Sequence, residues 1–119
     1  MNLENKIVVV TGAGSGIGRA LVVRFKAEGA KHVVSVDINP ESAEQTADLI
    51  GDRSFEADVS NENDVVRLIK MTEEEVGPID LFCSNAGIGP GKDLHSATNE
   101  DWQKSWDINV MSHVYAARH

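Results

Sequence analysis

The stretch that most constrains this chain runs from Thr11 to Gly18 and reads Thr-Gly-Ala-Gly-Ser-Gly-Ile-Gly. A β-branched run from Lys6 to Val10 precedes it, of the kind that fills a strand buried on both faces. After it, apolar residues recur among charged ones at roughly helical spacing up to Gly29, namely Ile17, Ala20, Leu21, Val23 and Phe25. The glycines are therefore predicted to form the turn between a buried strand and an amphipathic helix.

A glycine-rich turn at this place suits a phosphate group. Some of its positions need positive φ, and a Cβ would hold a pyrophosphate away from the backbone N–H groups at the helix N-terminus. The alternative is a glycine-rich turn that binds nothing. If the phosphate hypothesis holds, the contacts come from Gly12, Ser15, Gly16, Ile17 and Gly18.

A second buried strand is predicted from His32 to Val36, and it ends at Asp37, nineteen residues beyond Gly18. A carboxylate at this point accepts hydrogen bonds from the 2′- and 3′-hydroxyls of an adenosine ribose, and it repels a 2′-phosphate. The next residue is Ile38, no basic residue follows directly, and position 15 of the turn is Ser. The pattern predicts NAD rather than NADP, with Asp37 and Ile38 beside the adenosine.

The glycine spacing leaves three residues and then one between Gly12, Gly16 and Gly18, and it resembles the short-chain dehydrogenase/reductase family. Three later segments also resemble parts of the family. Asp58-Val59 is similar to its adenine-contacting pair, and Ser84-Asn85-Ala86-Gly87 is similar to its Asn-Asn-Ala-Gly turn. The segment from Trp106 to Val110 resembles the surroundings of its catalytic asparagine. By this resemblance the cofactor also contacts Asp58, Val59, Asn85, Ala86 and Gly87. An extended-branch epimerase is disfavoured, because that branch spaces its glycines two and two apart.

The resemblance also implies one catalytic residue, Asn109. In the family, the backbone of this asparagine holds a water that connects the catalytic lysine to solvent. Its side chain is expected to bend or cap its helix, and the alternative is a helix-boundary asparagine without a catalytic role.

The family's proton-transfer residues are a serine and a Tyr-x-x-x-Lys motif. The one tyrosine is Tyr115, four residues before His119 rather than a lysine, and we expect it to be a helix-face residue. Residues 1–119 are thus expected to be a truncated N-terminal portion of a single domain, inactive alone. Its parent would transfer a hydride between nicotinamide and an alcohol or ketone, and the alternative is a non-catalytic nucleotide-binding module.

The predicted fold class is α/β, a Rossmann-type doubly wound parallel sheet. Strands are expected over residues 6–10, 32–36, 53–57 and 79–84, with helices over 40–50 after Asn39 and over 61–76 after Ser60. The sequence Thr98-x-x-Asp101 predicts the start of another helix, on which Trp102 and Trp106 are expected to be packing residues. Right-handed crossovers give the strand order 3-2-1-4, a sheet that lacks its C-terminal strands.

Composition limits the partners. Eleven basic against nineteen acidic residues give a net charge of -8, which argues against nucleic acid or an anionic membrane. The single cysteine excludes a disulfide framework and no signal peptide is evident, so a cytoplasmic protein is expected. His95 and His113 lack further ligands at metal spacing, so no metal is predicted. The resemblance implies a homo-dimer or homo-tetramer of the full-length parent.

Overall fold

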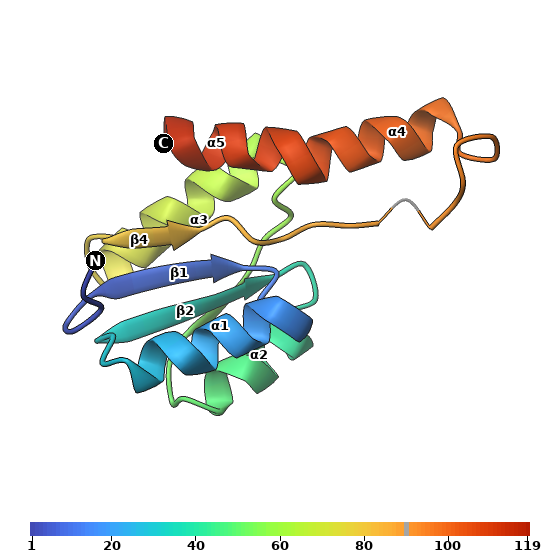
Figure 1. Cartoon of the computed structure of the whole chain (residues 1–119). Helices are drawn as coiled ribbons and strands as arrows, with labels where there is room; N and C mark the ends of the chain where they lie inside the picture. The colour runs from blue at the N-terminus through green and yellow to red at the C-terminus, as the bar shows by residue number, and fades with distance from the viewer. Residues whose placement is uncertain (90) are drawn as a thin grey trace.

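The computed structural model describes residues 1–89 and 91–119, and its centre is a four-stranded parallel sheet (Figure 1). The strands are β1 (Ile7–Thr11), β2 (His32–Asp37), β3 (Ser54–Glu56) and β4 (Leu81–Cys83). Their order is β3-β2-β1-β4, so the predicted fold class and strand order are confirmed. The reversal of order between β1 and β4 opens a crevice at the carboxyl ends of these strands.

Alternation along β1 builds a core on both faces of the sheet. Val8 and Val10 pack with Val33 on one face, and Val9 packs with Val34 on the other. The register places Val8 beside Val33 and Val9 beside Val34, so each face receives matching residues from the two strands. A sheet buried on both faces needs a helix layer on each side, which explains the continuous apolar runs in the sequence.

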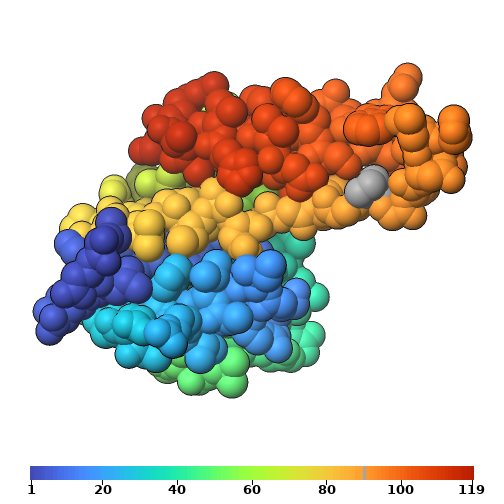
Figure 2. Space-filling view, viewed as in Figure 1, coloured from blue at the N-terminus to red at the C-terminus, as the bar shows by residue number. Residues whose placement is uncertain are grey.

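Two helices cover one face of the sheet, and the remaining helices lie on the side of the other face (Figure 1). The first layer holds α1 (Gly16–Ala27) and α2 (Pro40–Asp48). The second holds α3 (Glu62–Glu75) and a long rod made of α4 (Asn99–Trp106), the π-helical turn η1 (Asp107–Met111) and α5 (Ser112–Arg118). The rod and the segment leading to it extend past the sheet, and the molecule measures 48 × 27 × 26 Å (Figure 2).

The buried face of α1 differs from the prediction. Val22 and Gly18 are its buried residues, whereas Ile17 is 74% exposed and Val23 is 43% exposed. Gly18 and Val22 are four apart and so share one face of the helix. The helix faces the sheet through this side because only glycine at 18 allows α1 to approach the end of β1, as its contact with Gly12 shows below.

The N-cap of α3 is Asn61 and not Ser60. The Asn61 side chain accepts a hydrogen bond from the backbone N–H of Asn63. The Ser60 hydroxyl is occupied elsewhere, because it donates to Asp58 Oδ1 at 2.6 Å. The Asn39 cap of α2 and the first-turn Pro40 are as predicted, with Asn39 accepting from Ser42 N.

The start of α4 is a full capping box, as the sequence predicted. Thr98 Oγ1 accepts from Asp101 N, and Asp101 Oδ2 accepts from Thr98 N. A hydrogen bond from Lys92, helped by those from Thr98, lowers the pKa of Asp101 to about 2. The irregular segment before α4 is described except at Pro90, which lies outside the described residues.

The two tryptophans of α4 do not pack as predicted. Trp102 and Trp106 are each 55% exposed. Four positions apart on an eight-residue helix, both lie on a side of the rod that the rest of the described chain does not cover. In the part of the chain that the structure describes, no helix combines the length and apolar character needed to cross a membrane.

Candidate functional site

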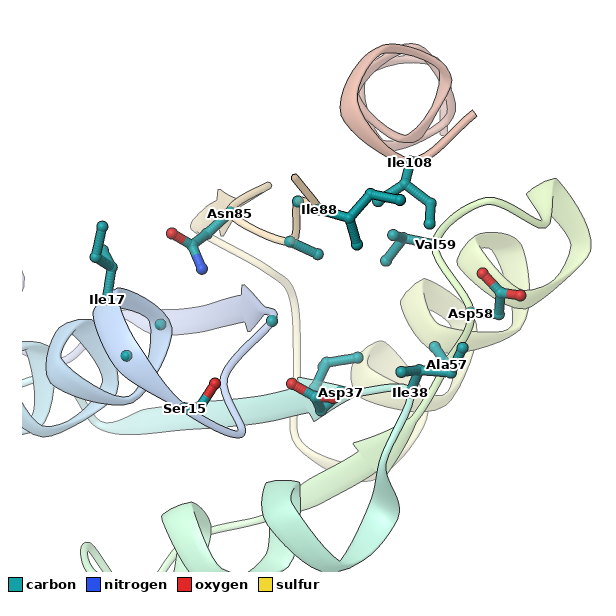
Figure 3. Close-up of a pocket in the computed structure, with 16 residues that line it drawn as sticks. Ser15, Ile17, Asp37, Ile38, Ala57, Asp58, Val59, Asn85, Ile88 and Ile108 are labelled. Carbon is teal, nitrogen blue, oxygen red and sulfur yellow. The ribbon is translucent and has the colours of Figure 1, made fainter. Parts of the chain in front are cut away.

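A cavity of about 440 Å³ lies in the crevice at the carboxyl ends of the strands (Figure 3). The structure places all twelve residues predicted to contact a cofactor on its wall; they are Gly12, Ser15, Gly16, Ile17, Gly18, Asp37, Ile38, Asp58, Val59, Asn85, Ala86 and Gly87. These residues come from four segments that are distant in sequence. Since parallel strands end at one edge of the sheet, the fold brings the segments together there.

The two sides of the cavity differ in chemistry. As Figure 3 shows, Val59, Ile88 and Ile108 gather on one side with Asp58 near Val59, and across from them lie Ser15, Asn85 and the exposed Ile17. Apolar side chains suit the faces of a planar ring, and the opposite side offers hydroxyl, amide and backbone donors. The cavity can therefore bind a ligand with an aromatic base at one end and polar groups at the other.

The glycines of the turn are required by close approaches. A Cβ on Gly18 would lie 2.0 Å from the Gly12 carbonyl oxygen, and one on Gly12 would lie 2.8 Å from Ala86 Cα. Gly12 also has φ of 66° and Gly16 has φ of 51°, in the left-handed region that favours glycine. These contacts seat the first turn of α1 directly on the end of β1.

The turn forms a cradle that fits a phosphate. A Cβ on Gly16 would meet nothing within 4 Å, so a side chain there would take up space beside the N-terminus of α1. The first turn of α1 carries no acidic side chain. The first N–H groups of a helix lack partners within the helix and favour an anion, so this cradle fits the diphosphate of a dinucleotide.

Asp37 is held by two backbone donors at the end of β2. Its Oδ2 accepts from Gly14 N at 2.9 Å, and its Oδ1 accepts from Asn39 N at 3.0 Å. Each carboxylate oxygen keeps lone pairs for a further donor. The carboxylate therefore has a fixed orientation on the cavity wall and can still accept bonds from a diol.

Asp58 shapes the loop that follows β3. Its Oδ1 accepts from Ser60 N at 3.0 Å, and its own N–H donates to Asp64 Oδ2 at 3.0 Å. This backbone hydrogen bond, with the Arg67 guanidinium nearby, holds the pKa of Asp64 below its usual value against the effect of burial. The loop thus presents Val59, which is buried, to the apolar side of the cavity.

Thr11 joins the ends of β1 and β4. Its Oγ1 accepts from the N–H groups of Asn85 and Ala86 at 3.0 and 3.1 Å and donates to the Cys83 carbonyl at 3.4 Å. Asn85 Nδ2 returns a bond to the Thr11 carbonyl at 3.0 Å. Sequence reasoning had assigned Thr11 only to the turn, and the bonds show that it fixes the loop after β4.

Asn109 lies in the π-helical turn η1, inside the long rod, and its side chain does not cap a helix. Its Oδ1 accepts from Ile88 N and its Nδ2 donates to the Ile88 carbonyl, both at 2.9 Å. A Cβ on Gly87 would lie 3.1 Å from Asn109 Oδ1. Asn109 therefore anchors the loop after β4 to the rod, and single-turn π-helical segments of this kind are frequent at functional sites.

Sequence reasoning missed several residues of the site. Ile88 and Ile108 line the cavity, and each lies directly beside a predicted residue, Gly87 and Asn109, so motif adjacency could have suggested them. Arg19 gave no sequence signal. Its guanidinium donates to the Gly14 carbonyl and, at 3.0 Å, to Thr46 Oγ1, and so ties the turn to α2.

Among residues 1–89 and 91–119, no three His, Cys, Asp or Glu side chains lie close enough together to hold a metal ion. Burial raises the pKa of the Cys83 thiol, which keeps it in the protonated form that binds metals poorly.

Comparisons with known proteins match the chain to one family of oxidoreductases. The family model described as short chain dehydrogenase matches residues 6–119. An uncharacterized oxidoreductase of Thermotoga maritima is 37% identical over 92% of this chain and 45% of its own length. Epidermal retinol dehydrogenase 2 of Homo sapiens is 33% identical over 96% of this chain and 38% of its own.

A solved structure of a short-chain dehydrogenase/reductase has the same fold as this chain. The glucose/ribitol dehydrogenase of the short-chain type from Brucella melitensis superposes with a TM-score of 0.91 at 30% identity. The superposition covers 99% of this chain and 51% of the other. The chain thus spans about half or less of the length of the relatives that it matches.

Proposed function

Because the chain belongs to the short-chain dehydrogenase family, we propose that it is the NAD-binding part of an oxidoreductase that acts on an alcohol or ketone. The observation that carries the proposal is the single cavity wall shared by the glycine turn, Asp37, Asp58 and Asn85. A bound nicotinamide cofactor would supply the hydride chemistry, its oxidised form as acceptor and its reduced form as donor. The names of the relatives, a retinol dehydrogenase and a glucose/ribitol dehydrogenase, support alcohol chemistry as the class of reaction.

The residues would divide the cofactor between them. The N–H groups around Gly16 would hold the diphosphate, and the apolar side formed by Val59, Ile88 and Ile108 would enclose the adenine. Asn85, Ala86 and Gly87 would line the nicotinamide half. The small side chains of this loop support that role, because they allow a ribose and a ring to approach the backbone.

The preference for NAD over NADP would come from Asp37. Its fixed carboxylate can accept from both ribose hydroxyls, and its charge repels a 2′-phosphate. No basic residue follows directly in the sequence. Replacing it with alanine should weaken NAD binding by roughly 1–3 kcal/mol, the scale of a charge-assisted hydrogen-bond pair.

Asn109 would contribute to proton transfer rather than to hydride transfer. We propose that its backbone, in the π-helical turn, holds a water in the relay that would exchange with solvent the proton that the tyrosine of the family's Tyr-x-x-x-Lys motif gains or loses. The bonds from its side chain to Ile88 would keep this turn beside the cofactor loop. A π-helical turn supports the assignment because it breaks the regular α-helical pairing of carbonyls.

Direct titration of the purified chain with NAD and with NADP tests the proposal. We expect NAD to bind more tightly, and we expect the Asp37→Ala variant to lose that preference. Tighter binding of NADP to the wild type, or an unchanged preference in the variant, would show that the Asp37 argument is wrong. Wild-type chain that binds neither nucleotide would overturn the cofactor site itself.

A second experiment separates the enzyme from a non-catalytic nucleotide-binding module. The natural coding sequence should be determined beyond His119. A serine followed by Tyr-x-x-x-Lys, at roughly forty residues beyond Asn109, would make the whole protein an enzyme of this family. An immediate stop codon would favour the binding module, because the residue four positions after Tyr115 is His119 and not a lysine.

The surroundings of the protein follow from the same proposal. A net charge of -8 and a single cysteine support a cytoplasmic protein that binds neither nucleic acid nor membrane. We also propose that the whole protein forms a homo-dimer or homo-tetramer. Trp102 and Trp106, each 55% exposed, support an interface at α4, since large aromatic side chains are enriched at protein interfaces.

A further inference from the structure

The guanidinium of Arg19 lies at the junction of α1, α2 and the glycine turn. It donates through one terminal nitrogen to the Gly14 carbonyl and through Nε to Thr46 Oγ1 at 3.0 Å. Thr46 is fully buried, and its hydroxyl donates onward to the Ser42 carbonyl at 3.1 Å. The guanidinium of Arg19 therefore donates to two buried residues, Gly14 and Thr46.

Gly14 connects this junction to the Asp37 carboxylate. Its carbonyl accepts from Arg19, and its N–H donates to Asp37 Oδ2 at 2.9 Å. A Cβ on Gly14 would lie 2.8 Å from Asp37 Oδ2 and 2.7 Å from the Ser42 Cβ. Gly14 is therefore enclosed between the carboxylate and α2, and a shift of its backbone would move a donor of Asp37.

We propose that Arg19 is a positioning residue that sets the preference for NAD over NADP by holding Gly14 against the Asp37 carboxylate. The inference rests on the proposed function, since it concerns the same ribose site. A carboxylate discriminates a diol from a 2′-phosphate only where its oxygens are fixed toward the ribose. Two backbone N–H groups fix the Asp37 carboxylate. That of Asn39 belongs to the loop that directly follows Asp37, whereas that of Gly14 belongs to a residue whose carbonyl is bonded to Arg19 of α1.

The proposal separates Arg19 from a general anchor of the phosphate cradle. A residue that only supports the cradle would affect NAD and NADP equally, because both carry the same diphosphate. A residue that acts through Asp37 would weaken the binding of NAD alone, because only NAD has the free 2′-hydroxyl to which the Asp37 carboxylate would bond. The ratio of the two dissociation constants therefore distinguishes the two roles.

The experiment compares dissociation constants for NAD and NADP in wild type, Arg19→Ala and Arg24→Ala by calorimetric titration. Arg24 is the matched control, because it lies on the same helix, is exposed and, among the described residues, pairs only with Glu28. We expect Arg19→Ala to weaken NAD binding by about five- to tenfold, the loss of roughly one fixed hydrogen bond, and to change NADP binding by less than about twofold. Arg24→Ala should leave both constants unchanged.

Two further variants keep the test decisive. Thr46→Val removes the Nε partner with little change of shape and should lower the NAD to NADP preference by a smaller factor in the same direction. In the Asp37→Ala background, Arg19→Ala should cause no additional loss of preference, since two residues acting through one contact are not additive. If Arg19→Ala itself fails to fold, Thr46→Val supplies the same comparison.

Three results would overturn the inference. Equal weakening of NAD and NADP by Arg19→Ala would assign the residue to the cradle. A full additional loss in the Asp37→Ala background would show that Arg19 acts independently of Asp37. A wild-type chain that binds neither nucleotide would overturn the proposed function, and that outcome is recognisable because the Arg24→Ala control would also bind neither.

Discussion

Asn109 and Ile88 exchange two hydrogen bonds, one in each direction, between a side-chain amide and a backbone amide. Both distances are 2.9 Å, and the residues are separated by 21 positions in the sequence. The contact joins the π-helical turn of the long rod to the loop after β4, at the edge of the cavity. Asn109, for which we propose a role in proton transfer, thus also ties the loop after β4 to the rod.

Asn109→Ala should therefore loosen the rim of the cavity. We expect a loss of about 0.5–1.5 kcal/mol in the free energy of unfolding and weaker NAD binding, because Ile88 loses both partners. Urea denaturation and nucleotide titration measure the two effects. Gln103→Ala is the control, since its amide donates to Asp107 within the same rod and, in the part of the chain that the structure describes, to no other group. Equal losses in both variants would contradict a special role for the Asn109 contact.

Thr11→Val should be costly because one hydroxyl serves three backbone groups. The near-isosteric change leaves the N–H groups of Asn85 and Ala86 without their acceptor. We expect the free energy of unfolding to fall by about 1–3 kcal/mol, together with weaker nucleotide binding. Chemical denaturation and calorimetric titration check both.

The same substitution at Thr72 should have the opposite outcome. Thr72 is fully buried on α3, and its hydroxyl has no hydrogen-bond partner among the described residues. Replacing an unpaired buried hydroxyl with a methyl group removes a desolvation cost, so Thr72→Val should leave the stability unchanged or raise it. A loss as large as that of Thr11→Val would show that volume rather than hydrogen bonding decides both.

Gly16→Ala and Gly51→Ala should separate backbone strain from ligand binding. Both glycines have positive φ, at 51° and 64°, and a Cβ on either would meet nothing within 4 Å. Each alanine should cost about 1–2 kcal/mol of stability for the left-handed backbone. Only Gly16 lines the cavity, so only Gly16→Ala should weaken NAD binding, by about tenfold or 1.4 kcal/mol. Equal binding by both variants would place the diphosphate elsewhere.

Asp52 should make the fold sensitive to acid at the end of the sheet opposite the cavity. Its side chain is 3% exposed and accepts from Lys26 Nζ, Val33 N and Arg53 N, with His32 Nδ1 at 3.0 Å. Burial raises the pKa of Asp52, but these hydrogen bonds outweigh it and bring the pKa below the ordinary value of 3.8.

Because the folded pKa is lowered, the stabilisation by Asp52 is complete above pH 3.8 and is lost as the pH falls through the folded value. Asp52→Asn should cost about 1–3 kcal/mol at pH 7 and should flatten the loss of stability below pH 3.8. Asp48→Asn, an exposed change on α2, is the control. Urea denaturation across the acid range decides it, and an unchanged acid slope in Asp52→Asn would refute the assignment.

The sequence by itself predicted the strands, their order and seven residues of the cavity wall, in the glycine turn and at the end of β2, whereas the five in segments 58–59 and 85–87 came from the family resemblance. It did so because buried strands require continuous apolar runs, parallel connections are right-handed, and a glycine turn followed by a strand that ends in Asp is a local signal. The caps at Asn39 and Thr98 were equally local. The caps and the glycine turn depend on residues close together in the chain, whereas the strand order follows from the general handedness of parallel connections.

The tertiary structure alone decided which side of each element faces a partner. The buried side of α1 follows from the approach of Gly18 to Gly12, which no helical periodicity contains. The prediction that Ser60 caps α3 was wrong, because the Ser60 hydroxyl donates to the Asp58 carboxylate instead. The links from Arg19 to Gly14 and from Asn109 to Ile88 join separate elements. Such contacts depend on how the helices and the sheet pack against one another, so the spacing of residues in the sequence does not predict them.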